Sequence, residues 1–209
     1  MQAFTVMGVN ETQRLNSLLR LHFGSSILED YTSPEGVKQV SEAAYGRLGR
    51  AMRGIKKHPA PDACKEETHA SLYEFITNLE NDPLPGQYSK AAQENFDARH
   101  HAWCENRMTA FNKHLQPTDE EPEFTLTYGQ AQMWINLTLK YLTLLGHPIA
   151  VANSRYFHVP VDYTDAVHPF DALGVTRPLG GVRWSQLDRH QYWDYQQRLR
   201  AAGINLLDF

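Results

Sequence analysis

Two polar motifs in the C-terminal half contain residue types that bind or transform ligands. In the first, Gln132, Asn136 and Lys140 follow one another at intervals of four residues, so they lie on one face if the segment is helical. Two amides and an ammonium group could bind a carboxylate, a phosphate or the edge of a base. The same spacing is also typical of the solvent-facing edge of a buried helix, and both interpretations stay open.

The second motif is His158-Val159-Pro160-Val161-Asp162. In an extended chain, alternate side chains point to the same side, which places His158 and Asp162 together. A histidine beside a carboxylate can act as a general base with the group that orients it. Asp162, His158 and Lys140 are therefore the candidate catalytic residues. A structural alternative is that Asp162 caps the turn that follows.

A third group, Asp97, His100, His101 and Cys104, lies in the sequence FDARHHAWCEN. His100 and Cys104 are four residues apart and could ligate zinc, but a zinc site needs three or four ligands. No C-x-x-C or H-x-x-x-H motif supplies the others. Cys104 beside a histidine could instead be a nucleophile, and a packed polar face is the structural alternative. We therefore predict no metal and no cofactor.

Three arginines, Arg47, Arg50 and Arg53, recur every third residue and precede a short basic run. On a helix this spacing lines them along one face, where they could bind a phosphate. A solvated charged face explains the same pattern. These arginines join Gln132 and Asn136 as the candidate ligand-binding residues.

Helices must position most of these groups. The segment 127–146 is apolar around most of its circumference, which is typical of a helix inside a core. All but one of the predicted helices start after or next to a residue that can accept a hydrogen bond from the first turn. The predicted helices, with their capping residues, are 11–23 (Asn10), 34–55 (Ser33), 63–82 (Asp62), 88–115, 127–146 (Thr127, with Gln130) and 186–202 (Ser185, with Asp188).

The predicted fold is mainly α, a single domain of residues 1–209 with about six helices around the buried helix 127–146. At most a minimal β element is expected, formed by residues 4–7 and 156–161. Residues 116–124 form an acidic loop. Residues 147–183 are rich in proline and glycine and form a long loop of the kind that often carries function.

Composition limits the function classes. The chain of 209 residues has a net charge of -4, which argues against broad, nonspecific binding to nucleic acids. Two cysteines do not form a secreted disulfide framework. Lys140 interrupts the best apolar run, so no membrane span is expected. With no signal peptide at the N-terminus, we expect a soluble cytoplasmic protein, and the apolar end at residues 204–209 fits docking onto the core or onto a second copy.

The segments YGQAQMWINLTLKYLTLLG, HVPVD and WSQLD, the last followed by Tyr192 and Tyr195, resemble a family of helical bacterial proteins without an assigned activity. In that family a GQAQ helix, an H-x-P-x-D segment and a tryptophan-led C-terminal helix recur in this order. The resemblance covers the C-terminal half and part of the segment 97–104. It implies the fold and the grouping of these residues, not a mechanism. A lysine is common there at the position of Met133, which implies no catalytic role for Met133 here.

A more distant resemblance rests on Gln130 or Gln132, which precede Pro160-Val161-Asp162. Helix-hairpin-helix DNA glycosylases place a lysine or glutamine at the start of a buried helix and an aspartate in a later P-V-D segment. This chain departs from them, because its hairpin glycines are reduced to Gly129 and its net charge is acidic. The resemblance implies an enzyme that acts on DNA bases.

Three functions follow from these patterns. The first is a helical binding protein, of mobile-element or defence context, whose ligand is a protein or a nucleic acid. In it Gln132, Asn136 and Lys140 face His158 and Asp162 across a pocket. The second is an enzyme acting on a nucleotide or nucleic acid, with Asp162 or His158 as base and Lys140 as phosphate partner. The third is a structural or oligomerising module whose polar stripe faces solvent.

Overall fold

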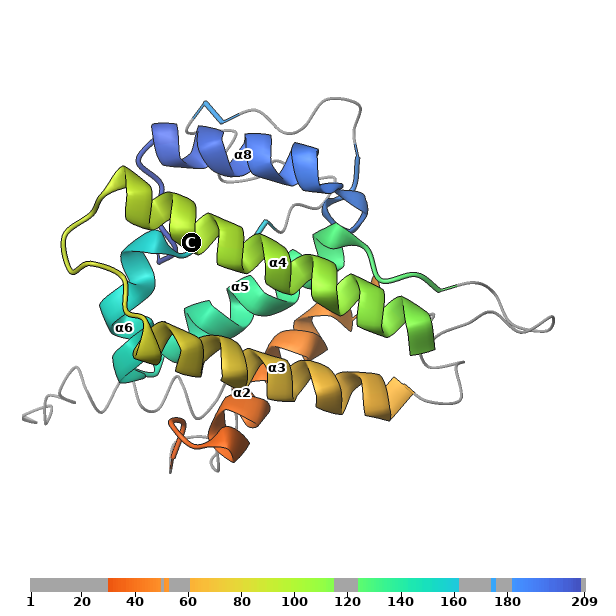
Figure 1. The fold of residues 1–209 in the computed structure, drawn as a ribbon. Coiled ribbons are helices and arrows are strands. Elements are labelled where there is room, and N and C mark those ends of the chain that lie inside the picture. Colours follow the sequence, from red (N-terminus) through yellow and green to blue (C-terminus); the bar gives the residue numbers. More distant parts are fainter. Residues whose placement is uncertain are drawn as a thin grey trace, which may run out of the picture.

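The computed structural model describes residues 30–49, 51–52, 61–114, 124–161, 174–175 and 182–207, and these form a bundle of helices (Figure 1). They contain no β-strand, and the predicted mainly α fold is confirmed. The helices are α2 (Pro34–Leu48), α3 (Pro61–Asn81), α4 (Lys90–His114), α5 (Tyr128–Leu144), α6 (Pro148–Asn153) and α8 (Arg189–Ala201), with the 3₁₀ helices η3 (Ser154–Tyr156) and η4 (Trp184–Gln186).

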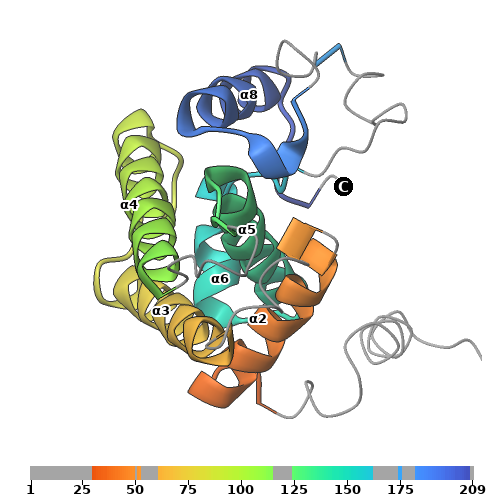
Figure 2. The same ribbon diagram turned by 90° about the vertical axis from the view of Figure 1, so that its right-hand side faces the viewer.

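Helix α5 lies at the centre of the bundle, between α2, α4, α6 and α8 (Figure 2), and most of its side chains are buried. The predicted capping box is present, because the Thr127 hydroxyl accepts from the Gln130 amide and the Gln130 side chain accepts from the Thr127 amide. The indole of Trp134 is fully buried and donates to the Ser41 hydroxyl of α2. The prediction of a buried central helix is therefore confirmed.

Two predicted helix boundaries are wrong near the start of the described chain. Helix α2 has the predicted cap, Ser33, but ends at Leu48 instead of continuing to residue 55. Gly49 follows with a φ of 30°, a left-handed conformation that ends a helix at little cost only for glycine. Helix α3 begins at Pro61, so Asp62 lies inside its first turn, where it pairs with Lys65 instead of capping the helix.

The last helix also starts later than predicted. Asp188 is its N-cap, and the side chains of Asp188 and Gln191 form a reciprocal capping box. Ser185 belongs to η4, one turn earlier. Ser185 and Asp188 are both possible caps. The second one is used because η4, which contains Ser185, packs against the start of α5.

The long segment 147–183 is not all loop. Proline at the first helical position and His147 before it start α6, which continues into η3. Tyr156 ends η3, and its hydroxyl donates to the backbone oxygens of Pro85 and Gln87. Residues 157–161 are not part of a strand, so the predicted β element is wrong for this segment. The predicted strand 4–7, the predicted helix 11–23 and residues 116–123 of the acidic loop lie outside the described residues.

The helices of the described ranges are all too short or too polar to cross a membrane.

Helix α5 and η4 are packed backbone to backbone at Gly129. Its amide donates to the Leu187 carbonyl oxygen at 2.9 Å. A Cβ at Gly129 would lie 2.1 Å from the Trp184 carbonyl oxygen, a distance that only movement of the backbone could relieve. Gly46, in the middle of α2, has no heavy atom within 4 Å of a Cβ in the same position. The two helical glycines therefore form a matched pair.

We expect Gly129→Ala to lower the free energy of unfolding by about 1–3 kcal/mol or more, because it overpacks the contact between α5 and η4. Gly46→Ala should raise it by about 0.5–1 kcal/mol, because alanine restricts the unfolded chain and favours helix. Urea unfolding followed by circular dichroism measures both. Equal stability of the two variants would contradict this account of η4 packing.

Candidate functional site

Helices α4 and α8 run antiparallel, and the candidate site lies between them (Figure 1). At one end Arg189 of α8 pairs with Glu105 of α4 at 2.8 Å. At the other end Arg200 of α8 binds Asp97 of α4. Between these two ion pairs the helices are separated by side chains, which form both a buried polar network and an open pocket.

The Asp97 carboxylate is the centre of the buried network. Its Oδ1 accepts from Gln93 Nε2 at 2.9 Å, from His158 Nε2 at 2.7 Å and from the Arg200 guanidinium at 2.6 Å. Oδ2 accepts from the second terminal nitrogen of Arg200 at 3.0 Å. Burial acts to raise the pKa of Asp97, but the bonds from His158 and Arg200 outweigh it and hold the pKa below its usual range. Asp97 is therefore ionised.

His158 is the partner that the sequence assigned to Asp162. Its side chain is only 1 % exposed, and burial lowers its pKa to about 4 despite the adjacent carboxylate. The imidazole is thus neutral. Because Asp97 can only accept, His158 carries its proton on Nε2, and its Nδ1 accepts from the Tyr192 hydroxyl at 2.6 Å.

From Tyr192 the network continues into α5. Asn136 Nδ2 donates to the Tyr192 hydroxyl and to Gln132 Oε1, both at 2.9 Å. Asn136 Oδ1 accepts from His100 Nε2 at 2.9 Å. Gln132, Asn136 and Tyr192 all have 0 % exposure. The solvent-edge interpretation is therefore wrong for Gln132 and Asn136, which belong to a closed network.

The remaining predicted residues are placed as follows. Lys140, the third member of the stripe, is half-buried on α5. Arg47 lies on the exposed side of α2, far along the chain from the network. Asp162, Arg50 and Arg53 lie outside the described residues. The pairing of His158 with Asp162 stays a prediction, and the carboxylate that the structure brings to His158 is Asp97.

The group around Cys104 does not have the properties of a reactive or ligating centre. Burial raises the pKa of the Cys104 thiol and lowers that of His100 well below its ordinary value. The thiolate that a nucleophile or a metal ligand requires is thus disfavoured. Nowhere in the described ranges do three or more histidine, cysteine or acidic side chains gather as a metal site would need.

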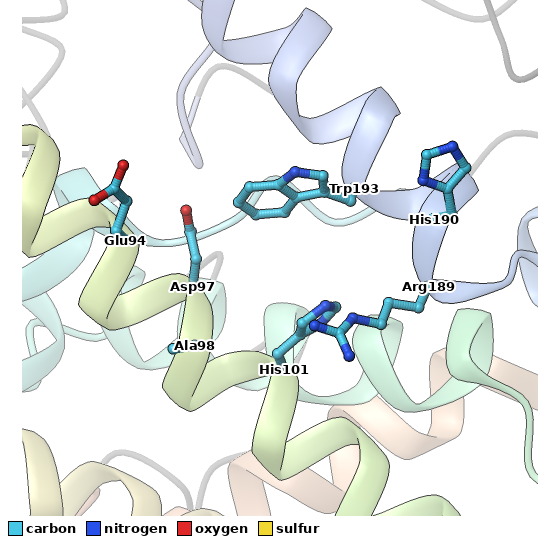
Figure 3. Close-up of a pocket in the computed structure, with 7 residues that line it drawn as sticks. All are labelled: Glu94, Asp97, Ala98, His101, Arg189, His190 and Trp193. Atoms are coloured by element: carbon cyan, nitrogen blue, oxygen red, sulfur yellow. The ribbon is translucent and has the colours of Figure 1, made fainter.

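An open pocket of about 390 Å³ borders the network (Figure 3). Asp97 joins the two, since it lines the pocket with one side and accepts the buried bonds with the other. Trp193 of α8 is half-buried and lies over the pocket, opposite His101 of α4. We call this the α4–α8 pocket; its lining is Glu94, Asp97, Ala98 and His101 of α4 with Arg189, His190 and Trp193 of α8.

His101 is held in place on the wall of this pocket. Its Nδ1 is hydrogen bonded to the Tyr128 hydroxyl at the start of α5. Burial is the main cause of its lowered pKa, so the ring is neutral near pH 7. Its ring centroid is 6.2 Å from that of Trp193. The pocket thus has the Trp193 indole, the imidazoles of His101 and His190, two carboxylates and the Arg189 guanidinium in its lining.

The arrangement can bind a ligand but does not expose a nucleophile. Asp97, His158 and Tyr192 form a carboxylate–imidazole–hydroxyl series, as in hydrolases that activate a hydroxyl. The Tyr192 hydroxyl is nevertheless fully buried, and burial raises its pKa well above the ordinary value. A substrate could reach the series only at Asp97.

Sequence reasoning missed Trp193, Glu94 and Arg189. A local signal existed on α4, because Glu94, Asp97 and His101 follow helical spacing and share one face. No signal linked that face to Trp193, which is almost a hundred residues further along the chain.

Comparison of the chain with family models, with curated proteins and with solved structures found no match. The resemblances to a helical bacterial family and to DNA glycosylases therefore stay predictions. The site is interpreted from its own residues.

We expect Tyr192→Phe to lower the free energy of unfolding by about 1–3 kcal/mol, because it leaves His158 Nδ1 and one Asn136 hydrogen buried without a partner. Tyr88→Phe is the control, since Tyr88 is 60 % exposed, and it should change stability by less than about 0.5 kcal/mol. Chemical unfolding measures both. A Tyr192→Phe variant as stable as the control would contradict a network that depends on this hydroxyl.

The buried neutral His158 makes stability depend on pH. Between pH 6.5 and about 4 the unfolded chain binds a proton at this histidine and the folded chain does not, so stability falls as pH falls through this range. We expect His158→Gln to reduce the slope of unfolding free energy against pH by roughly 1 kcal/mol per pH unit. Unfolding at pH 4.5–7.5 measures it, with the exposed His190→Gln as control. An unchanged slope in His158→Gln would mean that His158 is not held neutral.

Proposed function

We propose that this protein is a binding protein whose α4–α8 pocket takes a planar heterocycle that carries amino groups, the chemistry of a nucleobase. The observation that carries the proposal is the joining of an indole, Trp193, with the carboxylates of Glu94 and Asp97 in one open pocket. The sequence suggested a polar pocket within the C-terminal half, whereas the proposed pocket lies between α4 and α8 and is lined by different residues.

The indole of Trp193 provides a flat surface for stacking. The Arg200 guanidinium contacts this ring, 5.4 Å from its centroid, but lines a neighbouring pocket and not this one. A ring bound in the α4–α8 pocket would thus stack on an indole that is fixed by a cation. Stacking of a base on an aromatic side chain contributes about 1–3 kcal/mol.

The two carboxylates favour a ligand that donates hydrogen bonds. An ionised carboxylate accepts hydrogen bonds and donates none. Asp97 is kept ionised by its buried partners. Glu94 is exposed on α4 and can turn towards a ligand. Carboxylates accept from the amino groups of bases such as cytosine. A base with a carbonyl oxygen in that place would face repulsion.

Gln132, Asn136 and His158 take a supporting role in this proposal. Their hydrogen-bonding groups are already used within the buried network and by the α5 backbone, so they have none directed at a ligand. They act through Tyr192 and Asp97, which they hold in one orientation. The pocket wall is thereby preorganised, and less entropy is lost when a ligand binds.

A second candidate is an enzyme acting on a nucleotide or nucleic acid. It is favoured by the Asp97–His158–Tyr192 series, which ends at the pocket wall. The ionised Asp97 would stabilise positive charge that develops on a sugar as its base leaves. Release of free base from nucleosides or damaged DNA, measured by chromatography and reduced in Glu94→Gln, would favour this candidate over simple binding.

Isothermal titration calorimetry with cytidine, adenosine and uridine tests the binding proposal. We expect cytidine and adenosine to bind at least about tenfold more tightly than uridine, because only they offer an amino group to the carboxylates. Trp193→Ala should weaken all binding about tenfold or more, because the stacking surface is removed. Glu94→Gln should keep stacking but reduce the preference for cytidine over uridine.

Glu66→Gln is the matched control for Glu94→Gln. Glu66 is an exposed carboxylate on α3 that pairs with Lys38, just as Glu94 pairs with Lys90. Its replacement should change neither affinity nor preference. Equal affinities of wild type and Trp193→Ala, or no binding of any of the three nucleosides, would exclude the proposal.

A further inference from the structure

A second pocket, of about 320 Å³, lies next to the Asp97–Arg200 ion pair. It is formed where the start of α4, the end of α8 and the segment after α6 meet. Arg155 of η3 and Arg200 of α8 line it, together with Tyr88 and Asn205. We call it the arginine pocket. Asp97 lines the α4–α8 pocket and is not among the described residues that line the arginine pocket, so the ion pair lies at the border between the two.

The charge of the arginine pocket is positive. Among the described residues that line it are two arginines and no acidic residue. Asp97 balances the charge of Arg200 from outside the pocket. Arg155 is exposed, and no acidic partner is found for it in the described ranges. The charge of Arg155 is thus left for a ligand.

The Arg200 guanidinium is fixed in place before any ligand binds. Its two terminal nitrogens hold the two oxygens of Asp97 at 2.6 and 3.0 Å. A guanidinium has five N–H donors, and this pairing uses two of them. The ion pair with Asp97 holds the remaining N–H donors of Arg200 in one orientation. A guanidinium held in this way is suited to bind an oxyanion with several oxygens.

Tyr88 adds a flat surface at the mouth of the pocket. Its ring is 60 % exposed and stacks on Tyr156, with centroids 5.9 Å apart and planes 17° apart. Tyr156 is itself held, because its hydroxyl donates to the backbone oxygens of Pro85 and Gln87 on either side of the turn before Tyr88. An exposed aromatic ring in a fixed position is thus available beside the two arginines.

We infer that the arginine pocket binds a phosphate group, which Arg155 and Arg200 hold between them. A phosphate has enough oxygens to accept hydrogen bonds from both guanidinium groups. Its negative charge is large enough to balance the positive charge of Arg155, since Asp97 already balances that of Arg200. The inference does not depend on the ligand of the α4–α8 pocket. The group belongs either to an inorganic phosphate or to a phosphorylated small molecule whose remaining part lies against Tyr88.

Titration calorimetry of the whole chain with sodium pyrophosphate, at low ionic strength, tests this inference. We expect Arg155→Gln to raise the dissociation constant at least tenfold. Arg47→Gln is the matched control, because Arg47 is an exposed arginine on α2 outside the pocket, and it should bind as the wild type does. Arg155 is exposed, so its replacement should leave the fold intact, which circular dichroism checks.

Two further measurements complete the test. The first distinguishes the source of the phosphate, and the second separates this site from the α4–α8 pocket. Tighter binding of a nucleoside monophosphate than of inorganic phosphate, reduced by Tyr88→Ala, would identify a phosphorylated small molecule, and equal binding would identify the inorganic ion. Glu94 lines the α4–α8 pocket but not the arginine pocket, so Glu94→Gln should bind pyrophosphate as the wild type does, even if nucleosides fail to bind. No pyrophosphate binding, or equal weakening by Arg155→Gln and Arg47→Gln, would overturn the inference.

Discussion

The ionised carboxylate of Asp97 is the constraint on which the site depends. A buried charge is stable only when it is paired and hydrogen bonded, because water can no longer solvate it. Gln93 comes from the same helix, but His158 and Arg200 come from distant parts of the chain. Helix α8 and the segment after α6 must therefore take the positions beside α4 that bring these groups to the carboxylate.

In the network behind Asp97, each hydrogen bond has a defined donor and a defined acceptor. Tyr192 donates to His158, which donates to Asp97, and Asn136 donates to Tyr192. An apolar core at this place would leave α8 able to shift along α4, since dispersion contacts have little directionality. Hydrogen bonds between α4, α5 and α8 restrict that movement, and the walls of the two pockets gain a defined geometry.

The two pockets differ in chemistry although they share a border. The α4–α8 pocket combines Trp193 with carboxylates, whereas the arginine pocket has cationic groups and Tyr88. Arg200 connects them, because it contacts the Trp193 ring and also pairs with Asp97. A change in the position of this guanidinium would alter both pockets, which makes Arg200 the point where their ligands could influence each other.

The sequence alone determined the elements that depend on neighbours along the chain. The capping box of Thr127 and Gln130, the buried helix after it and the polar face of Gln132 and Asn136 follow from spacing within a few residues. The start of the last helix was predicted at the wrong cap, Ser185 instead of Asp188. Local spacing does not say which of two nearby caps the packing will use.

Only the tertiary structure decided which groups meet. Asp97 and His158 are 61 residues apart, and each had been noted as a reactive type without the other. Their pairing arises because α4, α5, α8 and the segment after η3 bury their polar groups against one another, and the free energy of that packing is spread over the whole core. No spacing in the sequence encodes it, so both pockets became visible only in the folded chain.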